Sequence, residues 1–160
     1  MKLRRTSEGL RIQVERESET EEIGRAIAGN VTPDTVIGLV GPLGAGKTRL
    51  ARAIAEALDV DPQAIASPTF VLIHEYAGRM PVFHFDTYRI GSPAEFEALG
   101  AADYFAAGGL CLVEWADRVT GLLPRNAWWV RLELDASDPA RREIAIEAPV
   151  AVIDRLHAAL

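Results

Sequence analysis

The octapeptide Gly41-Pro42-Leu43-Gly44-Ala45-Gly46-Lys47-Thr48 decides the fold, because it matches G-x-x-x-x-G-K-[ST], the pattern of a loop that wraps nucleotide phosphates. Residues 36–40 before it are apolar and largely β-branched, which predicts a buried parallel strand. Residues 49–58 after it are rich in alanine and leucine, and their apolar positions recur at helical spacing. A chance glycine-rich turn is the alternative, but the two flanks and the octapeptide agree on a strand, a phosphate loop and a helix.

The residue types of the octapeptide suit the binding of an anion. Glycines let backbone N–H groups turn toward a polyphosphate where a Cβ would crowd the turn. The helix that begins near Lys47 directs the positive end of its dipole at the same anion. We expect Lys47 to face solvent until it reaches the β- and γ-phosphates, and the Thr48 hydroxyl to ligate Mg²⁺. The nucleotide-binding residues predicted here are Gly41, Leu43, Gly44, Ala45, Gly46, Lys47, Thr48 and Arg49.

Length and composition predict one globular domain over residues 1–160. The chain is 49% hydrophobic and 25% charged, which is ordinary for a soluble protein. Its net charge of −6 argues against a protein that binds nucleic acid without a partner, since phosphate contacts need clustered lysine and arginine. We therefore expect any RNA to be held by another subunit. Because no run of about 18 apolar residues occurs, we predict no membrane span and a cytoplasmic location.

Hydrophobic patterns and turn residues predict the remaining elements. We expect residues 1–9 to be frayed, and a capping box of Ser18 and Glu21 to open a helix that ends near residue 28. A second capping box, with Pro93 after Ser92, opens another helix. Further helices are expected over 102–107 and 150–160, and strands over 10–15, 70–76, 81–86, 110–114, 128–134 and 142–148. This order predicts an α/β fold of the P-loop type, with a mostly parallel central sheet flanked by helices.

Two of the predicted apolar strands end in an acid, Asp86 in one and Glu114 in the other. Ligands of α/β sheets bind outside the carboxyl ends of the strands, so both acids and the phosphate loop should face one crevice. A P-loop enzyme needs such an acid near Mg²⁺, and often a second one to orient the attacking water. The pattern leaves open which acid does which, and a solvated acid is the alternative at either position.

Other polar residues allow two interpretations each. Ser67-Pro68-Thr69 lies where P-loop switch proteins place a segment that senses the γ-phosphate, but any turn before a strand favours the same residue types. No metal-ligand spacing accompanies His74 or His84, so we interpret both as hydrogen-bonded structural residues. Trp115 can pack under a nucleotide or in the core. Cys111, the one cysteine, lies in an apolar run and is predicted to be a buried thiol.

Four motifs together resemble the TsaE (YjeE) family, the small ATPases of bacterial tRNA threonylcarbamoyladenosine biosynthesis. They are the phosphate loop, Ser67-Pro68-Thr69-Phe70, His84-Phe85-Asp86-Thr87-Tyr88-Arg89 and Glu114-Trp115. The resemblance covers about residues 10–148 in the family's order and spacing. The phosphate loop is generic, whereas the combination of the other three is specific. One departure is Arg49, where many relatives have a second threonine; on the loop helix it should face solvent or a partner.

The resemblance implies an enzyme that binds ATP with Mg²⁺ and hydrolyses it slowly when alone. Its implied partners are TsaD and TsaB, which make the N6-threonylcarbamoyl modification of adenosine 37, so that tRNA is met only indirectly. Carried over by position, Lys47 and Asp86 are catalytic, with Asp86 orienting or activating water. Thr48 and Glu114 resemble the Mg²⁺ ligands. Further nucleotide contacts implied in this way are Ser67, Thr69, Trp115, Glu17 near the adenine, and Arg141 or its neighbour Arg142.

Three other functions remain open from the sequence. A small-molecule P-loop kinase is the main alternative, although residues 91–109 contain no arginine for a lid over the phosphates. A GTPase is disfavoured because neither N-K-x-D nor D-x-x-G occurs. A nucleotide-gated docking module, with incidental turnover, is the third.

Overall fold

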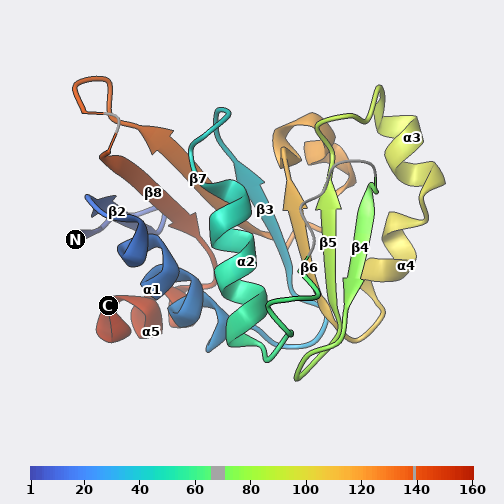
Figure 1. Cartoon of the computed structure of the whole chain (residues 1–160), viewed down its shortest axis with the longest axis horizontal. Helices are drawn as coiled ribbons and strands as arrows, with labels where there is room; N and C mark the ends of the chain where they lie inside the picture. Colours follow the sequence, from blue (N-terminus) through green and yellow to red (C-terminus); the bar gives the residue numbers. More distant parts are fainter. Residues whose placement is uncertain (66–70, 139) are drawn as a thin grey trace.

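The structure is a computed structural model that describes residues 1–65, 71–138 and 140–160. In these ranges one eight-stranded sheet has the order β1-β2-β8-β7-β3-β6-β5-β4 (Figure 1). The strands are β1 (Lys2–Arg5), β2 (Leu10–Val14), β3 (Val36–Val40), β4 (Ile73–Tyr76), β5 (Val82–Asp86), β6 (Leu110–Glu114), β7 (Trp128–Leu134) and β8 (Arg142–Glu147). The helices are α1 (Glu17–Ala28), α2 (Lys47–Ala57), α3 (Pro93–Ala98), α4 (Ala101–Phe105), the 3₁₀ segment η1 (Ala116–Leu122) and α5 (Val150–Ala159).

The predicted α/β class is confirmed, and the parallel part of the sheet is its centre. Strand β3 pairs in parallel with both β6 and β7, and β5 pairs in parallel with β6. The remaining pairings, β1 with β2, β2 with β8, β7 with β8 and β4 with β5, are antiparallel. Parallel strands need crossover connections, and α2 supplies one after β3. The sheet is therefore mixed, with antiparallel strands on both sides of a parallel core.

Helices cover the sheet on both faces. Helices α1 and α2 pack side by side on one face, in front of the sheet in Figure 1, and α5 contacts α1. A second apolar cluster joins α3, α4 and η1 to the other face through Phe96, Ala101 and Ala116. No helix of the described ranges is both long enough and apolar enough to cross a membrane.

Side chains alternate between these two faces along β5 and β6. Phe83 and Phe85 belong to the cluster with Phe96, whereas Val82 packs with the α2 side of the core. His84 stands between the two phenylalanines, and because successive strand residues point to opposite faces it lies on the α2 side. In register, His84 is opposite Leu112 and Asp86 is opposite Glu114. The polar residues of both strands are thus directed toward the helix that follows the phosphate loop.

The structure corrects two expectations at the start of the chain. Residues 1–9 are not frayed, since β1 pairs with β2 through Leu3 opposite Ile12. Helix α1 begins at Glu17 without a side-chain cap, so the predicted capping box of Ser18 and Glu21 is wrong. Glu19 serves instead: its carboxylate accepts a hydrogen bond from the Glu15 backbone N–H at 2.8 Å. A carboxylate in the first helical turn satisfies a free donor while matching the helix dipole.

The second predicted capping box is confirmed. Helix α3 begins at Pro93, and the Ser92 hydroxyl accepts a hydrogen bond from the Glu95 backbone N–H at 3.3 Å. The Glu95 carboxylate in turn accepts the N–H of Gly91. The helix therefore begins where the sequence indicated, because its signal is entirely local.

Candidate nucleotide-binding site

The phosphate loop connects the end of β3 to the start of α2, and two of its glycines have a conformation that requires glycine. Gly41 has φ of 150°, and a Cβ there would lie 2.2 Å from the backbone oxygen of Leu132. Gly46, the residue before α2, has φ of 105°, and a Cβ there would lie 2.9 Å from Nη1 of Arg142. L-residues with a side chain rarely adopt such φ values. The glycines thus allow the loop to turn tightly against β7 and β8.

Lys47 is held inside its own loop, which corrects the expectation that it faces solvent. Its ammonium donates to the carbonyl of Gly41 at 2.6 Å and to that of Pro42 at 2.8 Å, and the residue is 4% exposed. The ammonium also lies 3.7 Å from the ring centroid of Trp115, in a cation–π contact. An incoming phosphate must therefore replace two carbonyl acceptors.

Burial and nearby acids act on the Lys47 ammonium in opposite directions. Burial lowers its pKa, because a low-dielectric surrounding disfavours the charged form. The charges of Glu114, Asp117 and Asp86 each oppose this shift. The two acids predicted at the strand ends, Asp86 and Glu114, therefore converge on the lysine of the phosphate loop.

Thr48, Glu114 and His84 form one hydrogen-bonded chain. The Thr48 hydroxyl donates to Oε2 of Glu114 at 2.9 Å, and Nε2 of His84 lies 2.7 Å from Oε1 of the same carboxylate. Glu114 is 3% exposed and His84 4% exposed. A buried carboxylate is costly unless its oxygens accept hydrogen bonds, and both oxygens do so here.

Asp86 lies beside this chain but is not part of it. It is opposite Glu114 in the register of β5 and β6, and its Oδ1 accepts a hydrogen bond from the Tyr88 backbone N–H at 3.0 Å. The aspartate is half-buried, whereas Glu114 is buried. The two acids thus have different surroundings: Glu114 is bound to Thr48 and His84, whereas Asp86 accepts the backbone N–H of Tyr88.

Trp115 is placed by the segment that follows Asp86. It has a left-handed backbone with φ of 58°, and the Thr87 hydroxyl lies 2.7 Å from the carbonyl oxygen of Glu114 and 2.8 Å from that of Trp115. Its ring lies 4.9 Å from the ring of Tyr88, centroid to centroid. The Arg118 guanidinium extends the stack over Tyr88 at 5.1 Å. Of the two interpretations of Trp115, this geometry places its ring against the phosphate loop through Lys47.

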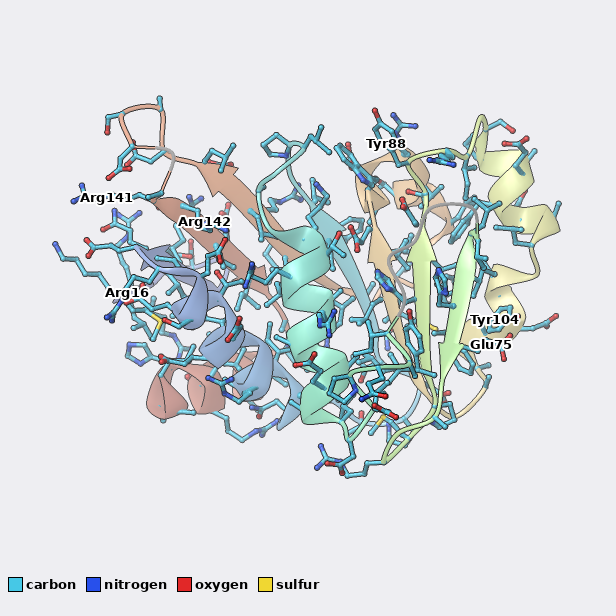
Figure 2. All side chains as sticks on the ribbon, viewed as in Figure 1. Arg16, Glu75, Tyr88, Tyr104, Arg141 and Arg142 are labelled. Atoms are coloured by element: carbon cyan, nitrogen blue, oxygen red, sulfur yellow. The ribbon has the colours of Figure 1, made fainter. Side chains whose placement is uncertain are left out.

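The other predicted residues lie on the far side of the loop helix from Tyr88. Figure 2 shows Arg141 and Arg142 at the start of β8, on the opposite side of α2 from Tyr88. Arg141 lies 3.5 Å from Asp138 and 3.9 Å from Glu15 in ion pairs. Arg49 forms ion pairs with Glu17 and Glu21 of α1.

Arg142 fits the site better than Arg141. Its Nη1 lies against Gly46, as the close approach noted above shows, and its Nε is buried with no hydrogen-bond partner in the described part of the chain. Arg142 also lines a hollow of about 360 Å³, together with Arg141, Glu15 and Leu134. Glu17 pairs with Arg49 at 2.9 Å. The predicted Ser67 and Thr69 lie outside the described residues.

The donor set at Thr48 and Glu114 suits magnesium. Among residues 1–65, 71–138 and 140–160, no group of three or more His, Cys, Asp and Glu side chains could hold a metal ion alone. Mg²⁺ prefers oxygen ligands and is usually bound through one or two protein groups, with phosphate oxygens and water completing its shell. A hydroxyl and a carboxylate in contact at the head of α2 match this requirement, and they would hold the ion next to a bound phosphate.

Fold and site define a class of protein. A parallel strand, a glycine loop of the G-x-x-x-x-G-K-[ST] pattern and a helix at the centre of an α/β sheet make this a P-loop protein. The family model "Threonylcarbamoyl adenosine biosynthesis protein TsaE" matches residues 14–144. The chain belongs to the TsaE family.

Individual relatives agree with this assignment. The tRNA threonylcarbamoyladenosine biosynthesis protein TsaE of Bacillus subtilis is 38% identical over 131 residues, which cover 81% of this chain and 80% of that protein. The protein of the same name from Treponema pallidum is 33% identical over 128 residues, covering 80% of this chain and 93% of that protein. The crystal structure of YdiB from Bacillus superposes with a TM-score of 0.74 at 30% identity, and the match covers 99% of this chain and 95% of that one.

Sequence reasoning did not assign two residues to the site. His84 was interpreted as structural, although the strand period puts it on the same face as Asp86, and that spacing could have placed it next to the loop. Thr87 was seen only as a member of a motif, and no local signal shows that it bonds the chain after β6. Contacts between strands that are far apart in sequence depend on register, which a single sequence does not reveal.

Proposed function

We propose that this chain binds ATP with Mg²⁺ in its phosphate loop and hydrolyses the nucleotide during the synthesis of N6-threonylcarbamoyladenosine in tRNA. The observation that carries the proposal is the contact of Thr48 with Glu114 at the head of α2, directly beside Lys47 and the glycine loop. This is the arrangement that a magnesium-bound triphosphate requires. The names of the matching relatives supply the pathway.

The roles of the residues follow from their places. Lys47 would exchange the carbonyls of Gly41 and Pro42 for phosphate oxygens, which are stronger acceptors because they are charged. Thr48 and Glu114 would hold Mg²⁺, which neutralises charge on the phosphates when bound. The backbone N–H groups of the loop would complete the anion cradle.

We assign to Asp86 the role of orienting the water that attacks the γ-phosphate. Glu114 is already engaged by Thr48 and His84, so it is poorly placed to take a proton from water as well. Asp86 is half-buried next to it, at the end of the neighbouring strand. Hydrolysis forms a bond between the water oxygen and the γ-phosphorus and breaks the bond to the ADP oxygen. Asp86 would orient the water by accepting a hydrogen bond from it, and the proton that the water loses would pass to the phosphate that is released.

The nucleoside end of ATP would lie on the side of Arg142 and Arg141. The buried Nε of Arg142 lacks a partner in the described ranges, its Nη1 lies against Gly46, and the residue lines the hollow of about 360 Å³. Leu43, Gly44, Ala45 and Trp115 complete the proposed contacts. We assign no contact to Arg49 or Glu17, because they are paired with each other.

The partner proteins of this proposal are of the TsaD and TsaB type, in the cytoplasm, and tRNA would be bound mainly by them. The net charge of −6 supports this division of roles, since an acidic protein repels a phosphate backbone. Hydrolysis would be slow in the isolated chain and faster with the partners.

Reconstitution tests the proposal. The chain is combined with TsaD- and TsaB-type proteins, tRNA and their small substrates, and both ATP hydrolysis and modified adenosine are measured. We expect modification to depend on this chain and on Asp86. Equal modification without the chain would contradict the proposal. Full modification by Asp86→Ala without hydrolysis would indicate a docking module instead, and transfer of γ-phosphate to a small molecule would indicate a kinase.

A further inference from the structure

We propose that His84 is a positioning residue for the metal site: it holds the Glu114 carboxylate in the orientation that Mg²⁺ needs. This inference rests on the proposed function, because it takes Glu114 as a magnesium ligand. His84 is a residue that the absence of metal-ligand spacing in the sequence marked only as structural. His84 touches neither phosphate nor the metal in this account, and it acts only through Glu114.

Both oxygens of the Glu114 carboxylate are engaged by neighbouring side chains. Glu114 has two oxygens, of which Oε2 accepts from the Thr48 hydroxyl at 2.9 Å and Oε1 lies 2.7 Å from Nε2 of His84. When the carboxylate is ionised it can only accept a hydrogen bond, so this role of His84 requires the imidazole proton on Nε2. The short distance is typical of a hydrogen bond with a charged partner.

The surroundings make the orientation of Glu114 depend on His84. Both groups are buried, with 5% of the His84 side chain and 4% of the Glu114 side chain accessible, so bulk water has little access to the bond between them. The His84 ring has little freedom because β5 is paired on both sides, with β4 through His74 and with β6 through Leu112. A rigid donor on a strand therefore sets the rotation of the carboxylate around its last bond.

The consequence for the metal follows from how ligands are held. Residues that bind a metal ligand from behind orient it, and losing such a partner typically weakens metal affinity about 10- to 100-fold. Without His84, Oε1 of Glu114 would be a buried oxygen without a donor, free to rotate toward Lys47 or Thr48. The carboxylate would then have to be reoriented whenever the ion binds.

His74 provides a matched control on the same face of the sheet. It is directly opposite His84 in the register of β4 and β5, and it is partly buried. The Glu114 carboxylate is hydrogen-bonded to Thr48 and His84, and in the described ranges Nε2 of His74 is without a hydrogen-bond partner. Replacing His74 thus removes an imidazole from the neighbourhood while leaving the bond to Glu114 in place.

The experiment measures the metal dependence of nucleotide binding rather than turnover. Affinity for ADP is determined by calorimetry with EDTA and with saturating Mg²⁺. The dissociation constant with EDTA, divided by the one with Mg²⁺, is the ratio that is compared between variants. His84→Phe keeps a ring of similar volume without the donor, and His84→Gln keeps an N–H at a similar distance. We expect the ratio to fall at least tenfold in His84→Phe, and to stay within about threefold of the parent in His84→Gln and His74→Phe.

Each possible result either supports or contradicts the role of His84. An unchanged ratio in His84→Phe, with the parent showing a clear metal effect, overturns the role of His84 and leaves the proposed function intact. A parent protein whose ADP affinity is indifferent to Mg²⁺ overturns both. If His84→Gln and His84→Phe both lose the effect of Mg²⁺ on ADP affinity while they melt like the parent, the imidazole acts by packing, and this result contradicts the inference.

A second measurement needs no variant at His84, so it decides the matter even if His84→Phe does not fold. Nitrogen-15 spectra of the imidazoles are recorded for the parent protein with ADP, before and after Mg²⁺ is added. We expect His84 to be protonated at Nε2 and its signal to shift when the ion is added, while exposed His157 stays unchanged. A His84 signal that does not shift when Mg²⁺ is added overturns the inference.

Discussion

Lys47 is the residue on which affinity for the nucleotide depends most. We expect Lys47→Ala to weaken ATP binding about 10- to 150-fold, because hydrogen bonds to charged groups contribute about 1.5–3 kcal/mol. The same change leaves the carbonyls of Gly41 and Pro42 without their buried donor, so a lower melting temperature should accompany it. Calorimetric titration and thermal unfolding measure the two effects. Unchanged ATP affinity would contradict the role of Lys47.

The pair of Thr48 and Glu114 governs the response to magnesium. We expect Thr48→Val and Glu114→Gln to shift the magnesium concentration for half-maximal ATP hydrolysis at least several-fold upward, since each removes an oxygen ligand or its charge. Titrating Mg²⁺ at fixed ATP measures this shift. Parent-like dependence in both variants would mean that the ion is held elsewhere.

Cys111 should be chemically inert in the folded protein. Burial raises the pKa of its thiol to about 12, and the residue is fully covered by the second apolar cluster. The reactive thiolate is therefore scarce at neutral pH. We expect no labelling by a thiol reagent under native conditions and complete labelling in denaturant. Rapid labelling of the native protein would show that this cluster opens readily.

At the scale of single residues, prediction from the sequence succeeded where a local pattern indicates one role for a residue. The octapeptide, the acids at the strand ends and the buried cysteine were all predicted from local patterns. The state of Lys47 was predicted wrongly, because the competing carbonyls of Gly41 and Pro42 are revealed only by the folded loop. The bond between His84 and Glu114 could not be predicted either, since it joins residues 30 positions apart through strand register.

At the scale of the element, the phosphate loop depends on glycine to different degrees at different positions. A Cβ at Gly41 would lie 2.2 Å from the backbone oxygen of Leu132, whereas one at Gly44 would meet nothing within 4 Å, although φ is positive at both. Gly44→Ala should therefore cost about 1–2 kcal/mol from backbone strain alone. Gly41→Ala should cost clearly more, because overpacking adds about 1–3 kcal/mol. Denaturant unfolding compares them, and equal losses would contradict the close approach of β7.

The start of α1 makes the stability of the protein sensitive to acid. A backbone hydrogen bond from Glu15, followed by the Met1 amino group, lowers the pKa of Glu19 to about 2 from its usual 4.5. A carboxyl with a depressed pKa stabilises the folded state above its unfolded value, and this contribution is lost as the pH falls from about 4.5 toward 2. We expect Glu19→Gln to be less stable than the parent at pH 7 and to lose less stability on acidification. Parallel stability curves would contradict this.

Element boundaries show which sequence signals were sufficient. The start of α3 was predicted correctly because its signal is local: the Ser92 hydroxyl accepts the backbone N–H of Glu95. At α1 the same pattern at Ser18 and Glu21 was misleading, since Glu19 binds the preceding backbone N–H instead. The strand β1 was missed because its short, charged sequence becomes a strand only by pairing with β2. Tertiary pairing, in other words, overrides weak local preference.

For the whole molecule, the α/β class was predictable from the order of elements, but the order of strands in the sheet was not. The antiparallel pairs of β2 with β8 and β7 with β8 bring the start and the end of the chain together. This arrangement places Arg142 of β8 against Gly46 of the loop. A nucleotide at the loop would therefore contact elements from both ends of the chain, and its binding should stabilise the fold as a unit.

The account is tested most directly by a crystal structure of the protein grown with a non-hydrolysable ATP analogue and Mg²⁺. We predict triphosphate density within residues 41–48, with the ion bound by Thr48 and Glu114. The Lys47 ammonium should have left the Gly41 and Pro42 carbonyls, where it now lies at 2.6 and 2.8 Å, for phosphate oxygens. A glycine loop that stays closed around Lys47 at saturating analogue, with the nucleotide absent or bound elsewhere, would contradict it.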